Sequence, residues 1–238
     1  MFSLIEKEIF AHKGSLEKRK ILSRFFKTGK GEYGEGDQFL GIPIPCQRSI
    51  AKKYNTQCSF GDIEKLLKSG WHEFRLIGLF ILVYRFKWAD KEEKKKIFYF
   101  YIQNISSVNN WDLVDTTTPH IVGEYMVLCP REKKRLYHWV RSKNIWERRI
   151  SLLATFAFIK RNQYEESRIL AETLLEDKHD LIHKASGWML REIGKRDGQI
   201  LKSFLKSFSH KMPRTMLRYA IEKFSPEERK IYMAKKNI

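Results

Sequence analysis

The chain has 238 residues, of which 42% are hydrophobic and 31% charged, a globular composition that excludes an intrinsically disordered chain. The net charge of +18 predicts a polyanionic partner, although charge alone leaves nucleic acid, a membrane surface and an acidic protein open. Three scattered cysteines and the lack of a long uncharged apolar stretch predict a cytoplasmic protein that is neither secreted nor inserted in a membrane.

Apolar residues recur at helical spacing along the chain, and glycine and proline are scarce, so we predict an all-α fold. The first helices are expected over 2–12 and 16–26, the second with Ser15 as its N-cap. Four glycines in 27–38 predict a flexible, polar loop, which either closes over a ligand or has no role. Further helices are expected near 47–54, 60–68, 71–87, 90–105, 111–118, 120–128, 131–142, 146–160, 164–176, 180–194, 197–207, 213–223 and 226–235.

A repeat with a period in the upper thirties runs through the middle of the chain. Its four copies align at Arg75, Asp115, Arg149 and Lys184. Helix pairs of this period stack as HEAT-like repeats, so we predict a single solenoid domain over residues 1–238 with a concave, basic groove. The three cations would project into that groove, where a row of positive charges suits a phosphate backbone.

Asp115 breaks the pattern of the repeat, because it places a carboxylate where the other copies carry cations. A negative charge in a DNA-binding groove repels phosphate, so binding alone does not explain it. The repeat leaves two interpretations open, a functional carboxylate and an ordinary salt bridge to Arg149 or its neighbours. Asp112, on the same predicted helix, is interpreted as a local cap or ion-pair partner.

Four motifs stand in order between residues 39 and 192. They are Phe39-Leu40-Gly41-Ile42-Pro43, Asn110-Trp111-Asp112-Leu113-Val114-Asp115, Asn144-Ile145-Trp146-Glu147-Arg148-Arg149 and Ala185-Ser186-Gly187-Trp188-Met189-Leu190-Arg191-Glu192. Together they resemble the AlkD-like DNA alkylation repair family. The resemblance implies a HEAT-like solenoid and a monofunctional DNA glycosylase of base excision repair, which releases N3-methyladenine and N7-methylguanine from double-stranded DNA.

Carried over by motif, the resemblance implies that Asp115 is the catalytic carboxylate and Arg149 its supporting cation, although Arg149 could instead grip a phosphate. It also implies that Trp111 and Trp188 are aromatic walls facing the lesion nucleotide. Phe25 falls where the family commonly has tyrosine, which makes it a candidate for lesion contact. The remaining candidates for DNA contact, chosen for their charge, are Arg48, Arg75, Lys184 and Arg191.

The chemistry of the implied reaction suits a single carboxylate. A cationic alkylated base leaves as a neutral molecule, so it needs no general acid, whereas ordinary glycosidases use two carboxyl groups. Asp115 would stabilise the oxocarbenium-like sugar and orient a water molecule. No metal or cofactor is expected, and a monomer, associated with the nucleoid when bound to DNA, is predicted. The alternatives are a non-catalytic HEAT-like DNA-binding module and a protein scaffold for an acidic partner.

Overall fold

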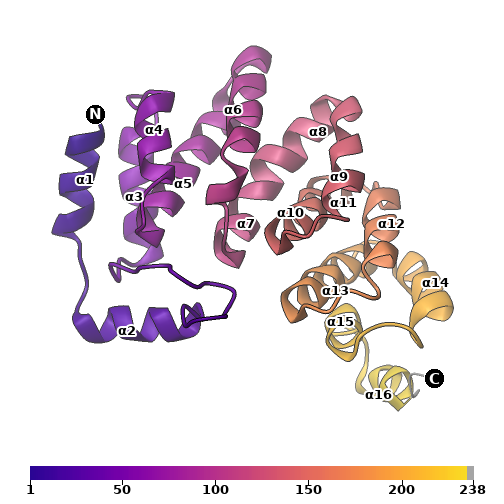
Figure 1. Ribbon diagram of the computed structural model, residues 1–238. Coiled ribbons are helices and arrows are strands. Elements are labelled where there is room, and N and C mark those ends of the chain that lie inside the picture. The colour runs from indigo at the N-terminus through magenta and orange to yellow at the C-terminus, as the bar shows by residue number, and fades with distance from the viewer. Residues whose placement is uncertain (235–238) are drawn as a thin grey trace. The chain divides into compact units, whose positions relative to one another are not determined.

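A computed structural model describes residues 1–234, and all the regular elements in that range are helices (Figure 1). The all-α class predicted from the sequence is therefore confirmed. The chain forms two compact units that divide between Ile121 and Val122. The expectation of one continuous repeat domain stays a prediction. None of the helices in the described part of the chain is both long enough and apolar enough to cross a bilayer.

The first unit begins at the N-terminus and ends within η2, a π-helical turn that carries the chain into the second unit. Its elements are α1 (Phe2–Ala11), α2 (Leu16–Phe25), α3 (Ile44–Tyr54), α4 (Phe60–Leu67), α5 (His72–Trp88), α6 (Lys91–Gln103), the 3-10 turn η1 (Ile105–Ser107), α7 (Trp111–Thr118) and η2 (Pro119–Gly123). Pro119 has no backbone N–H to donate, which explains why regular α-helical bonding stops there.

The second unit is built from short helices packed around α13. Its elements are α8 (Glu124–Leu128), the 3-10 turn η3 (Pro130–Lys133), α9 (Lys134–Trp139), α10 (Ile145–Ala154), α11 (Phe156–Ile159), α12 (Glu165–Thr173), α13 (Asp180–Gly194), α14 (Gly198–Phe208), α15 (Arg214–Ala220) and α16 (Pro226–Ala234). Helix α13 packs against α10, α12, α14 and α15. Gly187 allows α15 to approach closely, because an added Cβ would lie 2.4 Å from the carbonyl oxygen of Met216.

One predicted helix is two helices in the structure. The sequence predicts a continuous helix over 146–160, but α10 ends at Ala154 and α11 begins at Phe156. Thr155, between them, turns its hydroxyl back onto the Leu152 carbonyl at 2.6 Å, and its backbone N–H bonds the same carbonyl at 3.0 Å. The Leu152 carbonyl thus accepts from both the hydroxyl and the backbone N–H of Thr155. The backbone bond spans three residues instead of four, so the regular bonding of an α-helix is interrupted here.

Helix α5 forms the core of the first unit. It packs against α3, α4, α6 and α7, and its residues from His72 to Leu82 are all buried. A helix that is buried on every side shows little amphipathic pattern, and any polar side chain on it must find partners inside the protein. The first turn of α5 carries three such residues, His72, Glu73 and Arg75, and their partners define the candidate site.

Candidate functional site

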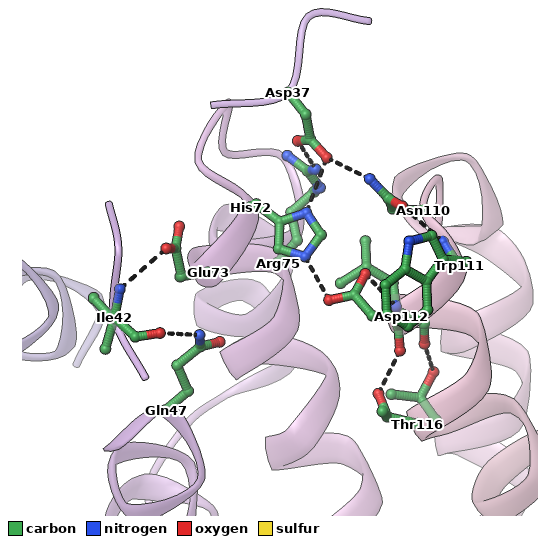
Figure 2. A network of polar contacts seen from close by, with 12 residues as sticks. Asp37, Ile42, Gln47, His72, Glu73, Arg75, Asn110, Trp111, Asp112 and Thr116 are labelled. Carbon is green, nitrogen blue, oxygen red and sulfur yellow. Dashed lines mark hydrogen bonds and ion pairs between the residues drawn. The ribbon is translucent and has the colours of Figure 1, made fainter. Parts of the chain in front are cut away.

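A network of buried polar groups joins the N-terminal ends of α5 and α7 to the loop over residues 27–38, called here the glycine-rich loop (Figure 2). Nδ1 of His72 lies 2.9 Å from a carboxylate oxygen of Asp37, and Nε2 lies 2.8 Å from a carboxylate oxygen of Asp112. Arg75 forms an ion pair with the other oxygen of Asp37. The side-chain amide of Asn110 donates to Asp37 at 3.1 Å. Asp37 therefore fastens the end of the loop to both helices.

His72 is the charged centre of this network. Both of its ring nitrogens face carboxylate oxygens, which can only accept hydrogen bonds when ionised, so the arrangement suits the doubly protonated imidazolium. Burial by itself would lower the pKa of His72, but the carboxylates of Asp112 and Asp37 outweigh it and raise the pKa to about 9. Burial would raise the pKa of Asp37, but His72 and Arg75 hold it below its usual value.

The stability of the protein should therefore depend on pH in the alkaline range. The pKa of His72 is about 9 in the folded protein and 6.5 when unperturbed, so its stabilising contribution is complete below pH 6.5 and is lost as the pH rises through 9. We expect the free energy of unfolding to fall by on the order of 3 kcal/mol over this range. Urea unfolding followed by circular dichroism at several pH values measures it. A constant stability between pH 6.5 and 9.5 would contradict the ionised state assigned to His72.

Glu73 organises the chain that follows the loop. Its carboxylate accepts hydrogen bonds from the backbone N–H groups of Leu40 at 2.9 Å, Gly41 at 2.7 Å and Ile42 at 3.3 Å. Gly41 has a φ of +82°, a conformation that favours glycine. The Phe-Leu-Gly-Ile motif therefore wraps its backbone around a buried carboxylate, and this contact places the segment against the start of α5.

Phe25 and Trp111, both predicted to contact the lesion, lie side by side. Their ring centroids are 5.8 Å apart with planes at 73°. The Trp111 ring also stacks on Phe26, with centroids 5.3 Å apart and planes at 15°. Phe25 remains 61% exposed, so the pair presents an aromatic surface to solvent. The structure thus brings together Phe25 and Trp111, two candidates that are 86 residues apart in the sequence.

These rings form part of the wall of a cavity of about 550 Å³ in the first unit. The lining is mostly apolar and comes from α2, the segment from Phe39 to Ile44, Gln47 of α3, and the N-terminal halves of α5 and α7. Trp111 and Thr116 line the cavity from α7. Ligand sites in proteins have this size and this largely apolar lining, with a few polar groups, so the cavity is a candidate binding site.

Asp115 lies on α7 between Trp111 and Thr116 in the sequence, but it is not one of the residues that line the cavity. It is half-buried and is four residues after Trp111, which places the two on the same side of the helix. Burial raises the pKa of Tyr101 to about 12, and the negative charge of Asp115 adds to this effect. The Asp115 carboxylate is therefore partly accessible to solvent, and it lies near enough to the buried Tyr101 to affect the pKa of that hydroxyl.

Three further expectations in the first unit have different outcomes. Arg75 was expected to contact phosphate; only 5% of it is exposed and it forms an ion pair with Asp37, and phosphate contact stays a prediction. Arg48 is exposed, with its guanidinium 4.1 Å from the ring centroid of Phe80, and phosphate contact stays a prediction. Asp112 does bond locally, to the Leu113 backbone N–H at 2.9 Å, but its second oxygen bonds His72, 40 residues away.

The second unit holds the remaining candidates. Arg149 is 4% exposed and donates a hydrogen bond to the backbone carbonyl of Leu181. Trp188 is half-buried, and its indole N–H donates to Glu192 at 3.3 Å. Trp146, expected in the core, is 7% exposed, which confirms that expectation.

The two basic candidates of the second unit are paired with acidic neighbours. Lys184 forms an ion pair of 2.7 Å with Asp180, one turn earlier on α13. Arg191 forms an ion pair with Glu222. The Lys184–Asp180 pair is exposed and therefore weak, whereas the Arg191 side chain is only 16% exposed; phosphate contact by either residue stays a prediction.

The sequence analysis missed His72, Asp37 and Glu73. A signal for two of them exists, because His72 and Glu73 are polar residues at the start of a strongly apolar helix. Asp37 gives no such signal within a loop rich in polar residues. Across residues 1–234, no group of three or more histidine, cysteine, aspartate or glutamate side chains is arranged to hold a metal ion.

Comparisons with known proteins agree with the motifs. A family model described as "DNA alkylation repair enzyme" matches residues 7–224. The solved structure of a predicted DNA alkylation repair enzyme from Enterococcus faecalis is 18% identical, covers 90% of this chain and 98% of its own, and superposes with a TM-score of 0.70. The X-ray structure of AlkD2 from Streptococcus mutans is 17% identical, with coverages of 91% and 95% and a TM-score of 0.53. No curated protein matches the chain.

Proposed function

Because this chain belongs to the family of DNA alkylation repair enzymes, we propose that it is a monofunctional DNA glycosylase for cationic alkylated bases such as N3-methyladenine and N7-methylguanine. One observation carries the proposal. Asp115, the carboxylate of the Trp-Asp-Leu-Val-Asp motif, is half-buried and lies one helical turn after Trp111, whose ring contacts the exposed ring of Phe25. A carboxylate on the same helix as an aromatic surface, one turn away from it, is suited to a cationic substrate.

The proposed reaction breaks the bond between C1′ of the deoxyribose and the nitrogen of the alkylated base. The bonding electron pair goes to the base, which neutralises its positive charge, so no proton donor is needed. Positive charge then develops on the sugar, and the Asp115 carboxylate stabilises it. A water molecule attacks C1′ and loses its proton, with Asp115 orienting the water and accepting that proton.

The aromatic residues would bind the cationic nucleotide. The faces of Trp111 and Phe25 attract a positively charged base or sugar, an effect of about 0.5–2 kcal/mol for each ring. In the second unit, motif resemblance supports the same role for Trp188 and a supporting role for Arg149. Arg48, Lys184 and Arg191 would contact phosphates, in keeping with the net charge of +18.

The proposal is tested by incubating the protein with duplex DNA treated with a methylating agent and by identifying the free bases by chromatography and mass spectrometry. We expect release of N3-methyladenine and N7-methylguanine, with no release from untreated DNA and no strand cleavage. Binding of the methylated duplex without release would instead support a non-catalytic DNA-binding module. Absence of DNA binding at physiological salt would support a scaffold for an acidic protein.

A further inference from the structure

The last turn of α7 carries three consecutive threonines, a residue type that is unfavourable in the interior of a helix. Thr117 and Thr118 are completely buried, so their hydroxyl groups need partners inside the protein. Thr116 and Thr117 donate to carbonyls one turn earlier, those of Asp112 at 2.7 Å and of Leu113 at 2.5 Å. Bonds of this kind slightly destabilise a helix and bend it, so the end of α7 depends on a neighbouring element for its position.

Tyr101, on α6, supplies that contact. Only 1% of Tyr101 is exposed, and its hydroxyl oxygen lies 3.1 Å from the hydroxyl of Thr117 and 2.9 Å from that of Thr118. The single hydroxyl proton of Thr117 is used by the Leu113 carbonyl, so Tyr101 donates to Thr117 and accepts from Thr118. The hydrogen bonds therefore run in one direction and end on the backbone of α7.

Asp115 lies in the turn that this chain of hydrogen bonds closes. Leu113 precedes it by two residues and Thr117 follows it by two, so both ends of the turn are tied to the phenol of Tyr101. Burial is the main reason why the pKa of Tyr101 is raised to about 12, and the charge of Asp115 adds to it. The phenol therefore keeps its proton near neutral pH, and the chain of bonds keeps its direction.

We propose that Tyr101 is a positioning residue, which holds the turn of α7 that carries Asp115 in the place needed for base release. This inference rests on the proposed function, because Tyr101 acts through Asp115. A carboxylate stabilises a developing cation only from a defined position, and a misplacement of about 1 Å can cost about 100-fold in rate. Tyr101 itself is sealed in the core and does not touch the substrate.

Tyr101→Phe tests the proposal, because it removes the hydroxyl and keeps the ring. On methylated duplex DNA, we expect the single-turnover rate at saturating protein to fall about 10–100-fold. The protein concentration that gives half of the maximal rate should stay the same, because no group that contacts DNA has changed. Thr118→Val, which removes the donor to Tyr101, should have a similar effect, whereas Thr118→Ser, which keeps it, should retain most of the rate.

A double variant tests whether Tyr101 and Thr118 act as one unit. If they do, Tyr101→Phe combined with Thr118→Val should be no slower than the slower of the two single variants. Hydrogen exchange provides a readout that does not involve catalysis. In Tyr101→Phe, the backbone amides of residues 114–118 should exchange faster than in the wild-type protein, while those of α5 should be unchanged.

The matched control is Tyr54→Phe, which also removes a buried tyrosine hydroxyl from the first unit. The Tyr54 hydroxyl donates to Glu8 at 2.5 Å, and a bond to a charged acceptor is at least as strong as one to a hydroxyl. Tyr54→Phe should therefore lower the thermal stability at least as much as Tyr101→Phe does, and yet leave the rate of base release unchanged. A loss of rate in both variants would assign Tyr101 a general role in stability and overturn the proposal.

The outcomes separate this inference from the proposed function. If the wild-type protein released no methylated base, both would fail. If the wild-type protein were active and Tyr101→Phe equally fast, only the positioning role would fail. A weaker half-saturation without a lower maximal rate would also overturn it. Circular dichroism establishes that each variant is folded, and if Tyr101→Phe does not fold, the difference between Thr118→Val and Thr118→Ser decides the matter.

Discussion

Replacing Asp115 with asparagine is expected to slow the release of methylated bases by about 10²–10³-fold, the usual effect of removing one electrostatic group that stabilises a transition state. Asparagine keeps the size of the side chain but removes the charge that would face the sugar cation. DNA affinity should stay the same or rise, because a negative charge near the phosphates is lost. Single-turnover rates on methylated duplex DNA and a separate binding titration measure the two effects.

The matched control is Glu64→Gln, which removes an exposed carboxylate from α4 in the same unit. It changes the net charge by the same amount and should leave the rate of base release unaltered. If Asp115→Asn lowered the rate and the DNA affinity together, Asp115 would have a structural role. An unchanged rate would remove Asp115 from the mechanism altogether.

The second large effect is expected on stability. Replacing His72 with glutamine should lower the free energy of unfolding by about 3–5 kcal/mol, the cost typical of removing one partner of a buried ion pair. Glutamine can donate to one carboxylate but carries no charge, so Asp37 and Asp112 would remain buried with Arg75 as the only cation of the network. Urea unfolding at pH 6.5 measures the difference.

Two further variants separate charge from packing. The exposed His12→Gln, in the same unit, should leave stability nearly unchanged. Adding Asp112→Asn to His72→Gln removes one of the buried anions left without its partner and should restore part of the lost stability. The fall in stability between pH 6.5 and 9.5 should also disappear in His72→Gln. A loss below about 1 kcal/mol would mean that His72 is not the charged centre of the network.

The buried polar network around His72 fixes the position of the helix that carries the proposed active residues. Asp112 is held by His72, and Asn110 bonds both Asp37 and the backbone N–H of Trp111. The first turn of α7, which carries Trp111 and leads to Asp115, is thus anchored to α5 and to the glycine-rich loop. The loop itself is folded into successive turns, with Gly31 and Gly36 at positive φ, and Asp37 at its end is its anchor.

The sequence by itself determined the all-α class, most helix positions and the candidates Trp111, Phe25 and Asp115. Helical periodicity and capping are local properties, so they can be read within a few turns of chain. The four motifs also indicated the family, because each is a short run of particular residues and the four follow one another in a fixed order along the chain. Helices were least well predicted where a side chain competes with the backbone, as Thr155 does between α10 and α11.

Only the tertiary structure decided which polar residues are partners. Arg75 belongs to the basic positions of the repeat, yet it is buried against Asp37, 38 residues earlier. Asp112 bonds His72 across 40 residues. Pairing of buried charges depends on distance in space and on exclusion of water, and neither is encoded in the spacing of residues along the chain.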